Sequence, residues 1–488
     1  MSHPRDGAAL LAALRREQLL VEAPQGLPDV SGITTDSRAV EAGVLFVAVR
    51  GSQVDGHRYL PDAIAAGATA VVVETRQGSR VPEIVVRDGR QAAIALAREW
   101  FGDPGRRLSL VGVTGTSGKT TTTLVMRHLL NGRATAGSIG TLGAFDGQGR
   151  SIPSTAGSLT TPGPVDLQAT LAALVAAGVD QVAMETSSHS LDQGRLDGLT
   201  FSGAIFTNLS REHLDYHRSM AEYRVAKLKL FDYLSPKGVA AVNADDPAWA
   251  DLLTRPGVVG FGTSPDAQVR AEGVTLLAAE SRFTIAGRFG TAAVELPLPG
   301  EFNVSNALGA AACALGLGCD LRSVVERLAS APQVPGRMER LVERPCLVIR
   351  DYAHKPDALE RVLRTLRPLT TGRLIVLFGC GGDRDKGKRP IMGRLAARLG
   401  DLSVLTSDNP RTEDPDRIID EIAGGVPPGT PVVRMADRRE AIRWALNEAR
   451  QGDTLLLAGK GHETYQVVGK DYLPFDEREI VAQALADR

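Results

Sequence analysis

The sequence predicts an α/β protein of three domains with parallel sheets. The chain of 488 residues is too long for one ordinary hydrophobic core, and domains of roughly 100 to 200 residues are expected. Short runs rich in β-branched residues, such as 70–73, 108–113 and 374–378, alternate with helical stretches rich in Ala, Leu and Arg. This alternation is typical of parallel sheets that are covered by helices.

Two helix-breaking segments mark the predicted domain boundaries. The segment FGDPG at 101–105 ends a helix just before a new strand, and QVPGR at 333–337 follows a helix that begins near Leu321. The predicted domains therefore span residues 1–103, 104–335 and 336–488, and each has an ordinary size.

Charge and apolar patterning exclude several classes of partner. The net charge is −1, which gives no general attraction to nucleic acid or to an anionic membrane. The first twenty residues lack the apolar core of a signal peptide, and no later stretch is apolar enough to cross a bilayer. Neither metal-like spacing nor obvious pairing relates Cys313, Cys319, Cys346 and Cys380. We therefore expect a cytoplasmic, monomeric protein with reduced thiols, no nucleic-acid partner and no membrane insertion.

A Gly-rich loop predicts nucleotide binding. A strand ending at Val113 leads into TGTSGKTTT at 114–122, and a helical stretch follows at 124–130. In such loops backbone N–H groups face a polyphosphate, the lysine, here Lys119, reaches the terminal phosphates, and the next hydroxyl, Thr120, can hold Mg²⁺. Val113 departs from the usual G-x-x-x-x-G-K-[ST] pattern by occupying its first glycine position. A structural turn would explain the glycines, but not a lysine followed by hydroxyl residues.

Two further strands end in side chains suited to a metal ion. The run 181–184 ends in Glu185, and ligands of open α/β sheets bind at the carboxyl ends of strands, so Glu185 is expected beside the phosphate loop. The run 204–209 leads to His213, whose neutral ring nitrogen could bind a metal. The alternatives are a solvated carboxylate at Glu185 and a structural histidine at either His213 or His217.

Lys227 lies on the apolar face of a helix predicted for residues 220–234. A helical projection places it between Tyr223 and Leu230, whereas Lys229 falls on the polar face. Burying an isolated ammonium group is costly and lowers its pKa. This lysine must therefore snorkel, pair with an anion or lose its charge, and a neutral amine could also be covalently modified.

These motifs, together with others along the chain, resemble the Mur ligase family. The matching segments occur in the family's order at residues 35–38, 43–48, 114–122, 160–163, 184–189, 207–209, 213–217, 300–307, 335–339 and 351–356. The resemblance implies an N-terminal uridine-nucleotide-binding α/β domain, a central P-loop ATPase-like domain with a parallel sheet, and a C-terminal Rossmann-like α/β domain. One departure is Glu212, where relatives commonly carry Asp.

The resemblance also implies roles for individual residues. ATP binding is implied for Gly115, Thr116, Ser117, Gly118, Lys119, Thr120, Thr121, Asn306, Arg337, Asp351 and His354. Binding of a UDP-linked muramoyl dipeptide is implied for Ser37, Thr160, Thr161, Ser187, Gln193 and Arg195. The implied catalytic residues are Lys119, Glu185, His213 and Lys227. The implied Mg²⁺ ligands are Thr120, Glu185, His213 and Lys227, the last as a carbamate (N6-carboxylysine) formed with CO2.

Three polar loops follow apolar strands, and the motif Asp408-Asn409-Pro410-Arg411 in one of them resembles the signature of the diaminopimelate-adding branch of the family. They lie at 381–389, 407–411 and 459–463, and each alone could be a solvated loop. Because arginine binds carboxylates through two parallel hydrogen bonds, Arg384 and Arg411 suit the acceptor's carboxylates. The implied acceptor site is Arg384, Asp408, Asn409, Pro410, Arg411, Gly459 and Glu463, with Asn409, Gly459 and Glu463 suited to the distal ammonium.

The activity implied by the resemblance is ATP-dependent amide-bond formation. Such an enzyme would add meso-2,6-diaminopimelate to UDP-N-acetylmuramoyl-L-alanyl-D-glutamate through an acyl phosphate, as a step of peptidoglycan synthesis that supports cell wall biogenesis, cell shape and cell division. One alternative is the same ligase acting on L-lysine or L-ornithine, which lack the distal carboxylate. Others are a folylpolyglutamate synthase, which should lack the uridine-binding domain, and a nucleotide-gated binding protein without turnover.

Overall fold

The computed structural model describes residues 6–51, 54–132, 134–153 and 159–487. The chain divides into two compact units, Met1–Val269 with Gly309–Val324 and Arg270–Leu308 with Val325–Arg488. Within the described ranges no helix is long and apolar enough to cross a membrane. The predicted boundaries near residues 103 and 335 stay a prediction, whereas the α/β fold class is confirmed by the sheets described below.

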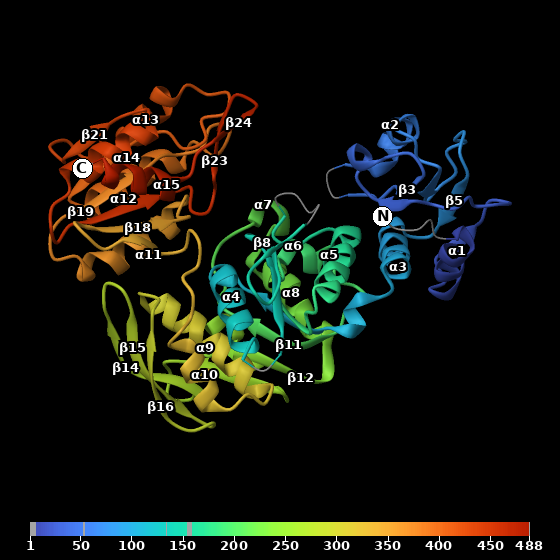
Figure 1. The fold of residues 1–488 in the computed structure, drawn as a ribbon, viewed down its shortest axis with the longest axis horizontal. Coiled ribbons are helices and arrows are strands. Elements are labelled where there is room, and N and C mark those ends of the chain that lie inside the picture. Colours follow the sequence, from blue (N-terminus) through green and yellow to red (C-terminus); the bar gives the residue numbers. More distant parts are fainter. Residues whose placement is uncertain (1–5, 52–53, 133, 154–158, 488) are drawn as a thin grey trace. The chain divides into compact units, whose positions relative to one another are not determined.

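The first unit begins with a five-stranded sheet of order β1-β5-β4-β3-β2, drawn in blue in Figure 1. Its strands are β1 (Leu20–Glu22), β2 (Gly32–Thr34), β3 (Val44–Val47), β4 (Ala70–Val73) and β5 (Glu83–Val86). All are parallel except β1, and β3, β4 and β5 are buried along their whole length. The accompanying helices are α1 (Gly7–Arg16), α2 (Leu60–Ala65) and α3 (Gly89–Phe101). Helix α3 ends where the sequence predicts, because Gly102 adopts the left-handed conformation (φ 75°).

A second sheet in this unit carries the phosphate loop. In this unit its strand order is β13-β12-β11-β6-β10-β7-β8-β9, parallel from β13 to β7 and antiparallel from β7 to β9. The strands are β6 (Ser109–Thr114), β7 (Ala136–Gly140), β8 (Gly143–Phe145), β9 (Ser151–Ile152), β10 (Gln181–Glu185), β11 (Phe201–Phe206), β12 (Leu234–Asn243) and β13 (Val258–Gly262). The helices are α4 (Lys119–Leu130), α5 (Pro164–Ala176), α6 (Ser188–Asp192), α7 (Leu214–His217) and α8 (Met220–Leu228). Since β10 and β11 flank β6 in parallel, their carboxyl ends meet at the edge where the phosphate loop begins.

The predicted helix over 220–234 is wrong in its extent. Helix α8 ends at Leu228, a 3-10 helix covers Lys229–Tyr233, and strand β12 begins at Leu234. The tighter helix carries Phe231 onto the core, where its ring stacks on Phe206 with centroids 4.6 Å apart. The apolar residues of 228–234 therefore belong to the core beneath the sheet and not to one helical stripe.

The second unit contains a six-stranded sheet of order β17-β18-β22-β19-β20-β21, parallel except for β17. These strands are β17 (Glu339–Val342), β18 (Leu347–Asp351), β19 (Leu374–Phe378), β20 (Leu402–Leu405), β21 (Val432–Arg434) and β22 (Thr454–Ala458). The remaining strands are β14 (Val269–Leu276), the antiparallel pair β15 (Ser281–Gly287) and β16 (Ala292–Leu296), and the hairpin β23 (Tyr465–Val468) and β24 (Asp471–Pro474). The helices that belong wholly to this unit are α11 (Pro356–Leu366), α12 (Lys388–Leu399), α13 (Pro415–Ala423), α14 (Arg438–Glu448) and α15 (Glu477–Ala486). The residues of α9 (Glu301–Gly316) and α10 (Leu321–Leu328) are divided between the two units. Apolar side chains of β18, β19, β20 and β22 form cores on both faces of the sheet. The four cysteines are thiols, as the sequence predicts.

Candidate active site

The Gly-rich loop connects β6 to α4 in the predicted order. Gly115 has a φ of 150°, and a Cβ atom there would lie 1.8 Å from Thr207 Oγ1, so only glycine fits this close approach. Gly118 caps α4, whose first residue is Lys119. Lys119 Nζ donates hydrogen bonds to the carbonyl oxygens of Gly115 (3.0 Å) and Thr116 (2.9 Å), so the lysine folds back over the loop. Loop N–H groups and the helix N-terminus together favour an anion here.

Thr207 and Asn208, which directly follow β11, hold the phosphate loop in place through hydrogen bonds to Ser117. Asn208 Oδ1 accepts a hydrogen bond from Ser117 N (2.9 Å), and Asn208 Nδ2 donates to Ser117 O (3.1 Å). Thr207 Oγ1 also donates to Ser117 O (2.8 Å). Segment 207–209 is among those that resemble the family, but the sequence predicts no role for either residue. The available signal is their position directly after β11, a strand that neighbours β6.

Lys227 lies against the phosphate loop. Its side chain is buried, with 1% exposure, so snorkelling is excluded. Its Nζ donates to the carbonyl oxygen of Gly115 (2.7 Å) and lies 4.4 Å from the centroid of the Tyr223 ring. Burial lowers the pKa of Lys227 well below its ordinary value, and the charge of Lys119 lowers it further, against an opposing effect of Glu212. Of the alternatives that the sequence leaves open, loss of charge fits this environment best.

Glu185 ends strand β10 in register with Val113, one residue before the end of β6. The carboxylate is buried and accepts hydrogen bonds from Thr141 N (2.8 Å) and Thr141 Oγ1 (3.2 Å). Gly140 leaves room for it, because a Cβ atom there would lie 2.3 Å from Glu185 Oε1. The expected position beside the phosphate loop is therefore observed.

The two candidate histidines have different surroundings. His217 is buried and its ring Nε2 lies 2.9 Å from Ser188 Oγ, which is a structural contact. His213 has 41% of its side chain exposed, and its Nε2 lies 3.8 Å from Glu212 Oε1. Its ring centroid lies 4.9 Å from that of His189. His213 is thus the more exposed of the two histidines, and its role as a metal ligand stays a prediction.

The fit of these side chains to Mg²⁺ depends on the substrate. Among the described residues no three His, Cys, Asp or Glu side chains come together as a ready-made metal site. Mg²⁺ in nucleotide enzymes is usually held by one or two protein groups, several waters and the substrate's phosphates. One buried carboxylate, Glu185, next to a phosphate loop whose helix begins with Lys119 and Thr120 fits that arrangement.

Four of the residues predicted to bind the muramoyl dipeptide form one hydrogen-bonded group. Thr161 Oγ1 donates to Glu185 O (2.9 Å) and accepts from Ser187 N (3.1 Å). Arg195 Nη1 donates to Thr161 O (3.0 Å), and Arg195 Nε donates to Gln193 Oε1 (2.9 Å). Burial lowers the pKa of Arg195 below its ordinary value. The group therefore joins the end of β10 to the turn after α6.

The other residues of this set lie at its margin or elsewhere in the unit. Thr160 Oγ1 accepts a hydrogen bond from Thr141 Oγ1 (3.2 Å). Ser37 begins a 3-10 helix after β2, in the part of the unit with the five-stranded sheet. Arg90 of α3, which sequence reasoning missed, donates to the carbonyl oxygens of Gln193 (2.9 Å) and Arg50 (3.0 Å). Arg90 therefore links Arg50, which follows β3, to Gln193 of the hydrogen-bonded group described above.

The second unit holds the remaining predicted ATP residues. Arg337 lies over the Tyr352 ring at 4.7 Å, and His354 Nδ1 lies 2.8 Å from Tyr352 O. Burial lowers the pKa of His354 to about 4, so its ring is neutral at pH 7. Asp351 at the end of β18 is buried, which raises its pKa. Asn306 lies apart from these on α9, where its Nδ2 donates to Asn303 Oδ1 (3.3 Å).

The predicted acceptor residues come together at the carboxyl ends of β19, β20 and β22. A Cβ atom on Gly381 would lie 2.9 Å from Arg411 Nη1 and 3.7 Å from Arg384 Cγ, so the two arginines approach one point of the chain. Arg411 Nη1 donates to Gly382 O (2.9 Å), and Arg384 Nη1 donates to Asp383 O (3.1 Å). Each arginine thus has a guanidinium group held by a loop carbonyl.

A buried lysine that sequence reasoning did not assign joins the other acceptor residues. Lys460 is fully buried, and its Nζ donates to Asn409 Oδ1 (3.1 Å) and Glu463 Oε2 (3.2 Å). Asn409 Nδ2 donates to the same Glu463 oxygen (2.9 Å). Asp408, also buried, leaves its Oδ2 without a hydrogen bond beside Gly459. Pro410 is buried between these loops.

Comparison with known proteins identifies the family. Domain profiles described as "Mur ligase family, catalytic domain", "Mur ligase middle domain" and "Mur ligase, glutamate ligase domain" match residues 29–102, 113–314 and 336–461. The UDP-N-acetylmuramoyl-L-alanyl-D-glutamate--2,6-diaminopimelate ligase of Gloeobacter violaceus is 43% identical, over 98% of this chain and 99% of its own. The chain belongs to the Mur ligase family. The relative of the same name from Geobacillus kaustophilus is also 43% identical, over 95% of this chain and 96% of its own.

Solved structures agree with membership of the Mur ligase family. A UDP-N-acetylmuramoyl-L-alanyl-D-glutamate--2,6-diaminopimelate ligase structure is 33% identical with a TM-score of 0.67, covering 97% of this chain and 98% of its own. A folylpolyglutamate synthase from Mycobacterium tuberculosis is 20% identical with a TM-score of 0.62, and the match covers 75% of this chain and 92% of its own. The second likeness shows a shared fold alone. The Mur ligase profile over residues 29–102 covers strands β2 to β5 of the five-stranded sheet.

Proposed function

We propose that this Mur ligase uses ATP to add meso-2,6-diaminopimelate to UDP-N-acetylmuramoyl-L-alanyl-D-glutamate, a step in peptidoglycan precursor synthesis. The observation that carries the proposal is the similarity, at 43% identity over nearly the full length, to relatives with that name. The approach of Arg384 and Arg411 to one point, in the same unit as the Glu463 carboxylate, supports an acceptor that carries both carboxylate and ammonium groups.

The first chemical step is activation of the dipeptide. An oxygen of its D-glutamyl γ-carboxylate attacks the γ-phosphorus of ATP, and ADP leaves, which forms an acyl phosphate. Lys119 and the loop N–H groups hold the phosphates, and Asn208 keeps the loop in shape through Ser117. Catalysis of this kind consists mainly of positioning and of neutralising phosphate charge.

Mg²⁺ would be held by Glu185, His213 and the Thr120 hydroxyl, with the carbamate of Lys227 as a further ligand. When bound, the ion supplies positive charge that neutralises the phosphate oxygens. The protein's own share is a carboxylate kept in place by Thr141 and by the space at Gly140.

The proposed carbamate follows from the state of Lys227. A neutral amine nitrogen adds to the carbon of CO2 and loses a proton, which converts the side chain into a carbamate anion. The buried amine at the loop, with its lowered pKa, favours the neutral form that this reaction requires. The product would carry a negative charge next to Lys119 and the proposed ion.

The second step joins the acceptor. The amine of diaminopimelate attacks the acyl carbon, the tetrahedral intermediate expels phosphate, and the amine loses a proton as the amide forms. Arg384 and Arg411 would bind the acceptor's carboxylates, whereas Glu463 would bind its distal ammonium group. L-lysine and L-ornithine would leave an arginine without its anion, and such a deficit discriminates strongly.

The remaining alternatives are less well supported. A folylpolyglutamate synthase would not need the N-terminal part of the chain, which contains the five-stranded sheet and the 3-10 helix that begins at Ser37. A nucleotide-gated binding protein would not need Lys119, Glu185 and Lys227 around one loop. We further propose that the enzyme acts as a cytoplasmic monomer and thereby supports cell wall biogenesis, cell shape and cell division.

The test is phosphate release from purified protein with ATP, Mg²⁺, bicarbonate and the UDP-muramoyl dipeptide. Meso-diaminopimelate, L-lysine and L-ornithine are compared as acceptors, and product mass confirms the amide. Turnover with diaminopimelate alone is expected. Turnover with lysine or ornithine instead would support a ligase but reject diaminopimelate as its acceptor. If folded protein shows no turnover with any of the three acceptors, the proposal that it is an enzyme is rejected.

A further inference from the structure

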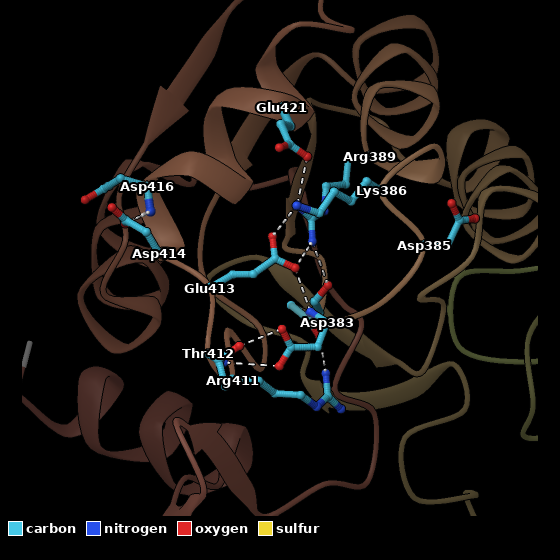
Figure 2. Close-up of polar contacts among 12 residues, drawn as sticks. Asp383, Asp385, Lys386, Arg389, Arg411, Thr412, Glu413, Asp414, Asp416 and Glu421 are labelled. Carbon is cyan, nitrogen blue, oxygen red and sulfur yellow. Dashed lines mark hydrogen bonds and ion pairs between the residues drawn. The ribbon is translucent and has the colours of Figure 1, made fainter.

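Beneath the acceptor loops a fully buried arginine is surrounded by carboxylates (Figure 2). Arg389, in the first turn of α12, has 0% exposure. Its Nη1 donates to Glu413 Oε2 (3.0 Å) and Glu421 Oε2 (2.7 Å), while its Nη2 donates to Glu413 Oε1 (3.0 Å) and to Gly381 O (3.2 Å). Arg389 therefore ties the loop that follows β19 to the residue two positions after Arg411.

Glu413 extends this connection to a second point on the same loop. Its Oε1 also accepts a hydrogen bond from Asp383 N (2.6 Å), and its Oε2 lies 3.2 Å from Lys386 Nζ. Asp383 in turn accepts from Thr412 Oγ1 (2.7 Å) and Thr412 N (3.3 Å). The hydrogen bonds from Arg389 are the main cause that lowers the pKa of Glu413 to about 2, so it is ionised at neutral pH.

The two loops are packed in a conformation that needs such support. Asp383 (φ 54°) and Arg411 (φ 50°) both adopt the left-handed region without being glycine. Between them, a Cβ atom on Gly382 would lie 1.9 Å from Pro410 O, so the two backbones approach closely. Backbone strain of this kind persists only where the surroundings fix the conformation. Here Arg389 and Glu413 provide many of the bonds that do so.

We infer that Arg389 and Glu413 are positioning residues that set the spacing of Arg384 and Arg411, and through it the selection of an acceptor by its carboxylates. This inference rests on the proposed function. Arg384 follows Asp383 directly and Arg411 precedes Thr412 directly, so the Arg389–Glu413 pair acts on both arginines through their chain neighbours. Neither member of the pair has to touch the acceptor.

The decisive variant is Glu413→Gln, with Glu421→Gln as its matched control. The four donor groups that contact Glu413 require acceptor oxygens, and the amide NH2 of glutamine would face two of them. Glu421 also bonds Arg389, but it lies on α13 and binds neither acceptor loop in the contacts described above. Both variants therefore replace a carboxylate that binds Arg389. Only Glu413→Gln also weakens the connection between the loop after β19 and the loop after β20.

Steady-state kinetics separate positioning from general stability. For Glu413→Gln we expect the KM for diaminopimelate to rise roughly 10- to 100-fold, as misplacement of a recognition group can cause. We expect the KM values for ATP and the dipeptide and the kcat at saturating acceptor to stay within about twofold, and the preference for diaminopimelate over lysine in kcat/KM to fall. Glu421→Gln should stay near wild type in all of these.

A milder variant covers the case in which Glu413→Gln does not fold. Thr412→Val removes only the hydroxyl bond to Asp383 at an exposed position, and a rise in the acceptor KM of about threefold is expected from the loss of one hydrogen bond. If folded Glu413→Gln has an unchanged acceptor KM and unchanged selectivity, the inference is overturned. The same result in Thr412→Val would overturn it where Glu413→Gln does not fold. Equal effects of Glu413→Gln and Glu421→Gln would also overturn it. A wild-type enzyme without diaminopimelate turnover would instead reject the proposed function.

Discussion

Replacing Lys227 with methionine tests the state of the side chain at the centre of the proposed mechanism. A lysine of ordinary pKa, near 10.4, is only about 0.1% neutral at pH 7.4. Each unit by which burial lowers the pKa raises the neutral fraction about tenfold until the neutral form dominates. Lys227 is 1% exposed and has a lowered pKa, whereas Lys229 is partly exposed and pairs with Asp192 at 2.8 Å. Carbamate formation should therefore select Lys227 over Lys229.

The assay follows the carbamate carbon directly. Protein equilibrated with 13C-bicarbonate at pH 7.4 should show one slowly exchanging carbamate resonance, retained in Lys229→Met and absent from Lys227→Met. Turnover should fall roughly 100- to 1,000-fold in Lys227→Met, as expected for the loss of a charged group that acts on the reacting phosphates. Removing CO2 should lower the activity of the wild type and leave the residual activity of Lys227→Met unchanged.

The direction of the pH dependence is fixed by the lowered pKa. As pH falls through the folded-state pKa of Lys227 the amine becomes protonated, so the carbamate resonance and turnover should decline together. In CO2-free buffer the Lys227 amine binds its proton more tightly in the unfolded state than in the folded state. Between the folded-state pKa and the unfolded-state pKa of Lys227, the free energy of unfolding should therefore rise with pH, by at most about 1.4 kcal/mol per pH unit. A carbamate resonance that persists in Lys227→Met, or wild-type turnover without any such resonance, would refute the reasoning.

Three further substitutions test separate parts of the site. Asn208→Ala removes two hydrogen bonds to Ser117 and should raise the KM for ATP about tenfold while the acceptor KM stays constant; an unchanged KM for ATP would reject its role in holding the loop. Glu185→Gln keeps the shape of the side chain but not its charge, so a Mg²⁺ titration should show half-maximal activity at a higher concentration and a kcat lowered roughly 100-fold; the metal assignment fails if both stay at wild-type values. Arg411→Met should reduce the preference for diaminopimelate over lysine by about 1,000-fold in a competition assay, and a constant preference would exclude carboxylate recognition by Arg411.

Much of the first unit could be predicted from sequence because its site follows from strand order. The run before Glu185 and the run before the Gly-rich loop both have the composition of buried parallel strands. Parallel pairing places the ends of such strands at one edge, and the register of Glu185 with Val113 is the observed result. The predicted position of Lys227 on the apolar face of its helix corresponds to a buried side chain, although the helix that carries it is shorter than predicted.

The rest could not be predicted because it depends on contacts between segments far apart in the sequence. The change from α-helix to 3-10 helix after Leu228 is decided by the packing of Phe231 on Phe206, which apolar periodicity does not contain. Asn208 and Arg90 act through hydrogen bonds to residues 91 and 103 positions away. The local sequence around a polar loop residue does not identify the distant residue to which its side chain forms a hydrogen bond.

The two buried lysines illustrate how surroundings that the sequence does not reveal decide chemistry. In sequence, Lys227 and Lys460 are each a lysine close to apolar or small residues. In the structure, Lys460 Nζ has a carboxylate partner, Glu463 at 3.2 Å, whereas Lys227 Nζ donates to a carbonyl oxygen. Burial of an ammonium group drives it toward the neutral amine, which is the direction of the pKa shift at Lys227. Reactivity toward CO2 is therefore expected at Lys227, whereas Lys460 should hold the Asn409 and Glu463 side chains of the proposed acceptor site through its hydrogen bonds.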